Sequence, residues 1–414
     1  MHRRPRHISA LLSTLQFQNP RPELLRTLDT HQWQELLKYS DRAHLTLIFG
    51  RTFRDYLPRA VQARIDQNHA DNALRRDSIQ TAYKEAADAL ASCGVPHLVL
   101  KGFSHCPDFV PDLRLRMQSD LDLYCPDGLH FRARDALRRL GYQDGVISER
   151  DFSDHVPPLI RPRGWKWKGN AFDPDMPPSV ELHYRFWNSS YIGIKGLADE
   201  NVWARRVERT IGPIRFTALH SVDSFTYAAL HALRHLLFGG VLPFHIYELG
   251  FFLEHNRDNE ALWRAWLSWH DDAARCAAAV PCLLAAQWFG CRLPSAVEAE
   301  IGRLPDGVRR WCATLADSPL TGLFQTNKDT LWLHLALVNS KRQKRSILVR
   351  QLFPFWVPPL SSQWVQQQAG LGSSEDKARI RRIFAYLYWF ADRICVHLRL
   401  LPLTLWHGLR LWST

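Results

Sequence analysis

Apolar residues recur at helical spacing over the first part of the chain. Leu11, Leu12 and Leu15 lie three and four residues apart, a spacing that places side chains on one side of a helix. Farther along, an Ala-rich stretch ends at Gly94, a residue typical of helix C-termini. We therefore predict an N-terminal helical region over residues 1–92.

The pattern changes to that of a small α/β domain between residues 93 and 215. Short runs of apolar or alternating residues bounded by Gly, Pro or Asp are typical of strands, and a longer amphipathic run between them is typical of a helix. The predicted strands are 97–101, 120–124 and 180–186, and the predicted helix is 127–141. With helices on both sides in sequence, the fold class is α+β, a small mixed-sheet core flanked by N-terminal and C-terminal helical domains.

Helical periodicity returns at Ser221. One apolar run ends at Gly239-Gly240, and residues 243–292 continue the pattern, so we predict a helical domain over 216–360. A polar linker is expected at Gln363–Gly372. The last predicted unit, 373–414, is a helical segment rich in aromatic residues and arginine.

Composition limits the classes of protein. The chain has 414 residues, 46% of them apolar, and a net charge of +12, which favours anionic partners such as nucleotides, nucleic acid or an acidic membrane surface. Its eight cysteines form no CxxC pair and fit a reducing compartment. Neither a signal peptide nor a membrane-spanning stretch is evident, so we expect a cytoplasmic protein.

Paired carboxylates are the main chemical signal. Asp120 and Asp122 alternate with Leu121 and Leu123 in a predicted strand, so the two carboxylates share one face. Two carboxylates held this close repel each other unless a cation neutralises them, and Mg²⁺ or Mn²⁺ prefers such oxygen ligands. A pair of these ions can stabilise the attacking and leaving oxygens of a phosphoryl substitution. On a neighbouring strand Glu181, two residues before His183, is the candidate third carboxylate.

Residues that could hold a phosphate precede the pair. Gly102 follows a predicted strand and lets the backbone approach a phosphate, and a helix starting there would point N–H groups at it. Ser104 offers a hydroxyl, while Lys101 and Arg116 offer positive charge.

The order of these motifs resembles the polymerase-β-like nucleotidyltransferases, and more narrowly the bacterial group described as uncharacterised nucleotidyltransferases. The matching runs are Leu100-Lys101-Gly102, Leu115-Arg116, Asp120-Leu121-Asp122-Leu123 and Glu181-Leu182-His183. The resemblance implies that Asp120, Asp122 and Glu181 bind two Mg²⁺ (or Mn²⁺) ions, and that Gly102 and Ser104 lie near the triphosphate of an NTP.

The implied reaction is transfer of a nucleoside monophosphate from an NTP to an acceptor hydroxyl, with release of pyrophosphate. The acceptor, a small molecule, a protein or an RNA, is left open by the sequence, as are the choice of NTP and the oligomeric state. Two alternative hypotheses for the function remain: an Asp-x-Asp glycosyltransferase that uses a nucleotide sugar, and a non-catalytic nucleotide-binding or interaction protein.

Three further features have alternative explanations. His231 and His235 lie four apart, with Glu248 beyond, and we expect helix packing ahead of metal binding. The basic run Lys341–Arg345 is expected to be a solvated helix face ahead of a nucleic-acid or lipid contact. The C-terminal segment is expected to pack on the helical domain, with peripheral membrane contact as the alternative.

Overall fold

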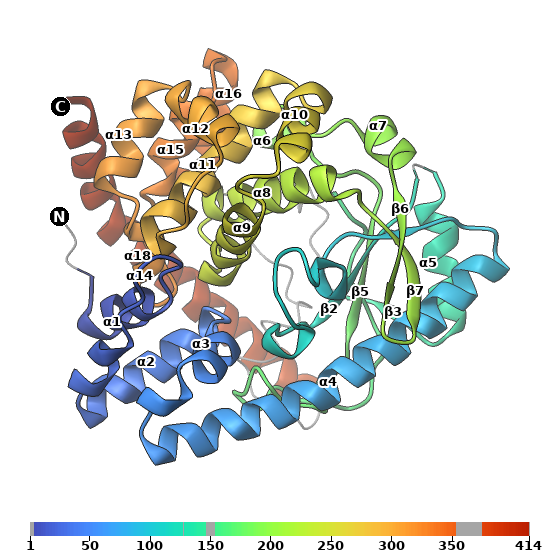
Figure 1. The fold of residues 1–414 in the computed structure, drawn as a ribbon. Helices are drawn as coiled ribbons and strands as arrows, with labels where there is room; N and C mark the ends of the chain where they lie inside the picture. Colours follow the sequence, from blue (N-terminus) through green and yellow to red (C-terminus); the bar gives the residue numbers. More distant parts are fainter. Residues whose placement is uncertain (1–3, 127, 146–153, 353–374, 414) are drawn as a thin grey trace.

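A mixed β-sheet lies between two layers of helices (Figure 1). The computed structural model describes residues 4–126, 128–145, 154–352 and 375–413. Within these residues the sheet has seven strands in the order β3-β4-β5-β2-β1-β7-β6. The strands are β1 (Leu98–Val99), β2 (Asp120–Tyr124), β3 (Gln143–Asp144), β4 (Leu159–Ile160), β5 (Ser179–His183), β6 (Val207–Ile211) and β7 (Ile214–Ala218). The predicted α+β class with helical flanks is confirmed.

The two central strands β2 and β5 run parallel and place Asp122 opposite Glu181. The other face of the two strands carries fully buried side chains that pack with α4 and α5, so the predicted alternating pattern is correct; they are Leu121, Leu123, Val180 and Leu182. The prediction that the second of these strands reaches residue 186 is wrong. The strand stops at His183, because the next two backbone N–H groups, those of Tyr184 and Arg185, donate to the carbonyl of Asp154.

The N-terminal region is helical, as predicted. Its elements are α1 (Arg6–Thr14), η1 (Pro22–Thr27), α2 (Thr30–Arg42), α3 (Thr46–Thr52), η2 (Arg54–Tyr56) and α4 (Arg59–Ser92). Gly94, just beyond the end of α4, has a φ of +63°, a left-handed conformation that glycine adopts without strain. Together with α5 (His130–Arg139), α4 covers the apolar face of the sheet.

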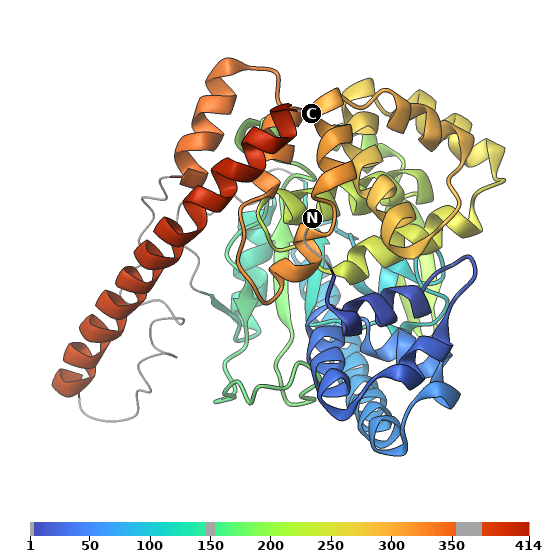
Figure 2. The same cartoon turned by 90° about the vertical axis from the view of Figure 1, so that its left-hand side faces the viewer.

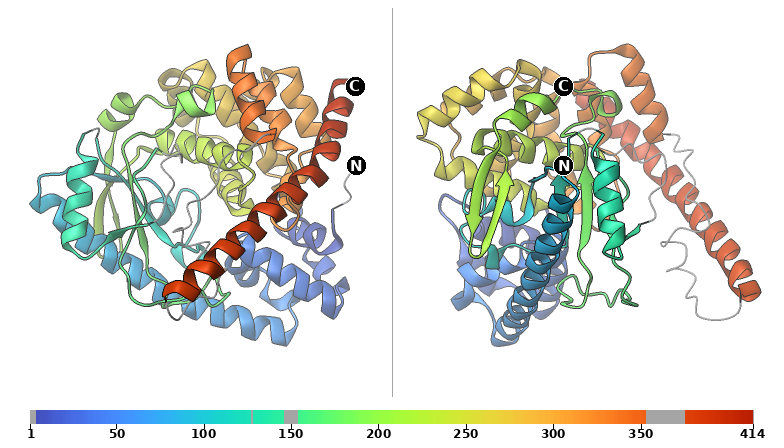
Figure 3. Two further views of the ribbon diagram at one scale, coloured as in Figure 1. Left: turned by 180° about the vertical axis from the view of Figure 1, so that it is seen from behind. Right: turned by 90° about the vertical axis from the view of Figure 1, so that its right-hand side faces the viewer.

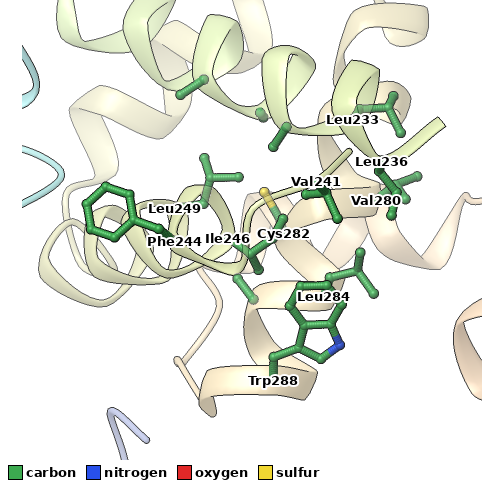
Figure 4. Packing of buried hydrophobic residues seen from close by; sticks show 14 of the residues in the cluster. Leu233, Leu236, Val241, Phe244, Ile246, Leu249, Val280, Cys282, Leu284 and Trp288 are labelled. Carbon is green, nitrogen blue, oxygen red and sulfur yellow. The ribbon is translucent and has the colours of Figure 1, made fainter. Parts of the chain in front are cut away.

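A larger helical region covers the opposite, polar face of the sheet. It comprises α8 (Ser221–Leu237), α9 (Pro243–His255), α10 (Glu260–Trp269), α11 (Asp272–Phe289), α12 (Ser295–Gly302), α13 (Asp306–Thr314), α14 (Ser318–Gly322), α15 (Thr330–Leu337) and α16 (Lys341–Leu352). Buried side chains from α8, α9 and α11, including Leu233, Phe244, Leu284 and Trp288, form its core (Figure 4). This packing fixes α8 and α9 against the sheet.

Short elements complete the chain before the final helix. They are η3 (Gly102–His105), η4 (Leu113–Leu115), α6 (Ser189–Ile192) and α7 (Asp199–Ala204). The final helix α18 (Glu375–Ser413) runs along the outside, and its N-terminal half stands away from the other helices and strands (Figures 2 and 3). The predicted polar linker 363–372 lies outside the described residues. Among the helices that are described, none has the length and apolar character needed to cross a membrane.

A buried arginine connects α4 to the segments that lead into both central strands. Arg75 is only 2% exposed and donates to the carbonyls of Gln118 (3.0 Å) and Asp173 (2.8 Å). Gln118 in turn donates to the carbonyl of Asp120 (2.7 Å). Arg75 therefore sets where β2 begins relative to the helix that covers it.

Replacing Arg75 with methionine should destabilise the protein, because two buried carbonyls would lose their donor. Each loss costs about 1–3 kcal/mol, so we expect the free energy of unfolding in urea to fall by about 2–6 kcal/mol. The neighbouring Arg76 makes only a 3.5 Å surface contact with Asp77. Arg76→Met is the matched control and should change stability by about 0.5 kcal/mol or less. Equal effects of the two substitutions would contradict this role of Arg75.

Candidate active site

The predicted carboxylates come together on the polar face of the sheet, facing α8. Asp120 and Asp122 lie on β2, and Glu181 lies on β5 directly opposite Asp122. Asp122 is 1% exposed, whereas the side chain of Glu181 is 20% exposed and Asp120 is half-buried. The three acids therefore line a surface that runs from the interior to the edge of solvent.

Asp122 is held by two cationic partners on one of its oxygens. Its Oδ1 lies 3.0 Å from Lys101 Nζ and 3.2 Å from His183 Nε2. Its Oδ2 is buried and has no hydrogen-bond partner among the described residues. A buried carboxylate oxygen without a partner is costly, so this atom is suited to a further cation.

His183 contacts Asp122 on one side and lies close to a second acid, Asp154, on the other. His183 is fully buried, and its Nδ1 lies 3.9 Å from Oδ2 of Asp154, which forms an ion pair with Arg234 of α8. Burial alone would lower the pKa of His183, but its contacts with Asp122 and Glu181 and the charge of Asp154 raise it to about 9. His183 therefore carries a proton, and its charge offsets part of the acidic cluster.

Lys101 is the other cation on Asp122, and it bridges the sheet to α8. Its Nζ lies 3.0 Å from Asp122 and 3.1 Å from Nε2 of His231, which is 3.0 Å from Nε2 of His235. Burial opposes the charge on Lys101, but the acids, Asp122 foremost, raise its pKa. Burial and the charge of Lys101 hold the pKa of His231 well below its usual range, so His231 is neutral and can accept from the ammonium.

The pKa values of Asp120 and Asp122 are shifted in opposite directions. Burial would raise the pKa of Asp122, but the charge of Lys101 and the hydrogen bond from His183 hold it well below its usual range. For Asp120, burial and the charge of Asp122 prevail and raise its pKa to about 7. Asp120 is thus the acid in this cluster whose charge is least compensated by the protein itself.

The residues predicted to lie near a phosphate occupy a tight turn after β1. Gly102 has a φ of +75°, and a Cβ there would lie 2.1 Å from the side chain of Gln118. Ser104 lies in η3, a single 3-10 turn rather than the start of a longer helix, and its Oγ donates to the carbonyl of Lys101 at 3.1 Å. Gly102 is therefore required for the close approach of this turn to the segment that leads into β2.

Arg116 lies next to the site but is engaged with another acid. Its Nε is 2.9 Å from Oε1 of Glu248 on α9, and the same oxygen is 3.0 Å from Nδ1 of His105. All three side chains are buried. Burial would raise the pKa of Glu248, but Arg116 and His105 lower it to about 2. This network joins η3 to α9 and fixes the position of Arg116.

The side chains fit a divalent cation. Ligand atoms of Asp122, Glu181 and His183 all lie within 4.8 Å of one another, and Asp120, on the same strand, is outside that group. Carboxylate oxygens suit Mg²⁺ or Mn²⁺. His183 already donates to Asp122, so the oxygens of Asp122 and Glu181 are the atoms of this group that suit such an ion.

Several residues of the site could not be found from sequence patterns. Asp154 and Arg234 are paired across 80 residues of chain, and no local motif marks either of them. His231 and His235 were noted as a helical pair, but their contact with Lys101 depends on how α8 crosses the sheet. They do not join Glu248 in a metal-binding group among the described residues.

Three comparisons with known proteins give one match, to a protein family. No curated protein and no solved structure shows significant similarity to the chain. A family model described as uncharacterised nucleotidyltransferase matches residues 29–290, which is more than half of the chain and runs from the N-terminal helices through the sheet to α11. With the paired acids and the Lys-Gly turn all inside the matched range, the chain belongs to this nucleotidyltransferase family.

Proposed function

We propose that the protein transfers a nucleoside monophosphate from an NTP to an acceptor hydroxyl and releases pyrophosphate. In this reaction the acceptor oxygen bonds to the α-phosphorus, and the bond between that phosphorus and the bridging oxygen of the β-phosphate breaks. The observation that carries the proposal is the acidic cluster of Asp120, Asp122 and Glu181, in which one buried carboxylate oxygen has no partner.

The metal ions would be held by Asp120, Asp122 and Glu181. The resemblance to the family implies two such ions. When bound, Mg²⁺ or Mn²⁺ ions supply positive charge to the phosphate oxygens and lower the pKa of the acceptor hydroxyl. Glu181, at the solvent edge of the cluster, would face an incoming acceptor, whereas Asp122 lies deepest.

Lys101 is suited to bind a phosphate oxygen. An ammonium has three N–H donors, and Asp122 and His231 take two of them. We propose that the third is offered to the triphosphate, with Gly102 and Ser104 in the turn beside it. Arg116, fixed by Glu248, would add positive charge to the same region without leaving its ion pair.

Helices on either side of the sheet in sequence contribute residues next to the acidic cluster, among them His231 of α8 and Glu248 of α9. We propose that residues 93–215 form the catalytic unit, while the helical regions 1–92 and 216–360 shape the acceptor side. The eight cysteines, all in described positions, form no disulfide, which supports a reducing compartment such as the cytoplasm.

Transfer of label from an α-³²P-labelled NTP tests the proposal directly. Purified protein with Mg²⁺ or Mn²⁺ and a total cell extract as acceptor source should produce a labelled product. Asp120→Asn and Asp122→Asn should each lower the rate by about 10²-fold or more, since each removes a charge on which the transition state depends. The size of the labelled product would identify the acceptor class.

Asp135→Asn is a matched control, because Asp135 is an exposed aspartate on α5, which covers the face of the sheet opposite the acidic cluster. Its rate should equal that of the wild type. Absence of transfer with all four NTPs, from a folded protein and a complete extract, would overturn the proposal. In that case sugar transfer from a labelled nucleotide sugar, or nucleotide binding without turnover, would be tested next.

The proton on His183 makes stability depend on pH in metal-free buffer. The folded-state pKa is raised to about 9, whereas an unfolded histidine titrates near about 6.5. The stabilisation is therefore fully present below about pH 6.5 and is lost as the pH rises through about 9. We expect the free energy of unfolding in urea to fall over this window by at most about 3 kcal/mol.

His183→Gln should remove most of this pH dependence. His255→Gln, at an exposed histidine on α9, is the control and should keep the wild-type slope. If the wild type and His183→Gln show parallel curves between about pH 7 and 9, His183 does not hold the proton assigned to it.

A further inference from the structure

The C-terminal helix α18 contacts the rest of the protein through one face of its C-terminal half. Trp332 of α15 donates from Nε1 to the carbonyl of Thr404 (3.0 Å), and His407 Nδ1 lies 2.7 Å from Oδ1 of Asp329. Gly408 packs so close to Trp332 that an added Cβ would lie 2.2 Å from the ring. This end of the helix is therefore fixed on the helical domain.

The opposite face of α18 carries a row of exposed apolar side chains. Phe384, Tyr388, Leu398, Leu405 and Leu409, here named the apolar row, are between 45% and 73% exposed. Their positions follow a repeat of alternating four- and three-residue steps, and Ala391, Cys395 and Pro402 fill its remaining places. Such spacing puts all of these residues on one side of a helix.

The apolar row is broad and continuous along the helix. Leu387, Ile394 and Trp406 lie beside it and are 43–53% exposed. A helix packed on a soluble domain normally turns polar residues to the side away from that domain. An exposed apolar surface of this extent marks a place where something else binds.

The charges on this part of the chain indicate what binds there. Over α18 the sequence has seven cations and three acids; the cations are Lys377, Arg379, Arg381, Arg382, Arg393, Arg399 and Arg410, and the acids are Glu375, Asp376 and Asp392. Among the described side chains, Arg393, Arg399 and Arg410 are exposed. Two copies of this helix laid face to face would bring like charges together, whereas an anionic surface would neutralise them.

We propose that α18 is a membrane-binding helix that lies along the surface of an anionic bilayer, with the apolar row in the acyl region. Arginines beside such a row contact acidic headgroups, and Trp and Tyr favour the interface. The helix does not have the apolar length to span, so it lies in the plane of the interface. The proposal is independent of the chemistry proposed for the acidic cluster.

Sedimentation of the full-length protein with vesicles tests this. Wild type should bind vesicles of phosphatidylcholine with phosphatidylglycerol, and not phosphatidylcholine alone. Phe384→Ser/Leu398→Ser/Leu409→Ser should lower the partition coefficient by about ten-fold or more, since three exposed apolar side chains are lost. Arg399→Gln/Arg410→Gln should weaken binding to the anionic vesicles and reduce its dependence on salt.

Leu74→Ser is the matched control, because Leu74 is 59% exposed on α4, a helix that lies apart from α18 (Figure 2). It should bind vesicles as the wild type does. The proposal is overturned if wild type binds neither vesicle. It is also overturned if the triple variant melts well below the Leu74 control, which would mean that the row is covered within the chain. A wild-type dimer that the triple variant converts to monomer would assign the row to a second copy instead.

Discussion

Burial of the Asp122 carboxylate between Lys101 and His183 is the interaction on which the rest of the site depends. A lone buried carboxylate would take up a proton rather than stay charged. Two cations on one oxygen keep Asp122 ionised and leave its other oxygen uncommitted. The contact with Lys101 connects β2 to the segment that follows β1, and the contact with His183 connects β2 to β5. The same two ion pairs therefore keep Asp122 charged and stabilise the pairing of these strands.

The cations are in turn held by a second layer of polar residues that comes from the helical region. His231 of α8 accepts from Lys101, and Arg234, one turn farther on, neutralises Asp154 beneath His183. The position of α8 is fixed by a large apolar core with α9 and α11. The matched family region runs through α11 and so includes the helix that carries these partners and the helices that pack against it.

The sequence was informative where a short pattern decides structure. Alternation at 120–124 correctly gave the strand, its buried leucines and the shared face of Asp120 and Asp122, because the two-residue period of a strand is local. Contacts between distant segments were not predictable in this way. Asp154 with Arg234, and Arg116 with Glu248, depend on how helices cross the sheet, and the early end of β5 depends on a carbonyl that arrives from another segment.

The proposed divalent cation site consists of the uncommitted oxygen of Asp122 together with Asp120 and Glu181. Titration with Mn²⁺, followed by electron paramagnetic resonance in the presence of a non-hydrolysable NTP analogue, measures this without requiring the acceptor. We predict saturable binding by the wild type and loss of that binding in Asp122→Asn with the fold retained. Equal Mn²⁺ binding by the two proteins would contradict the claim.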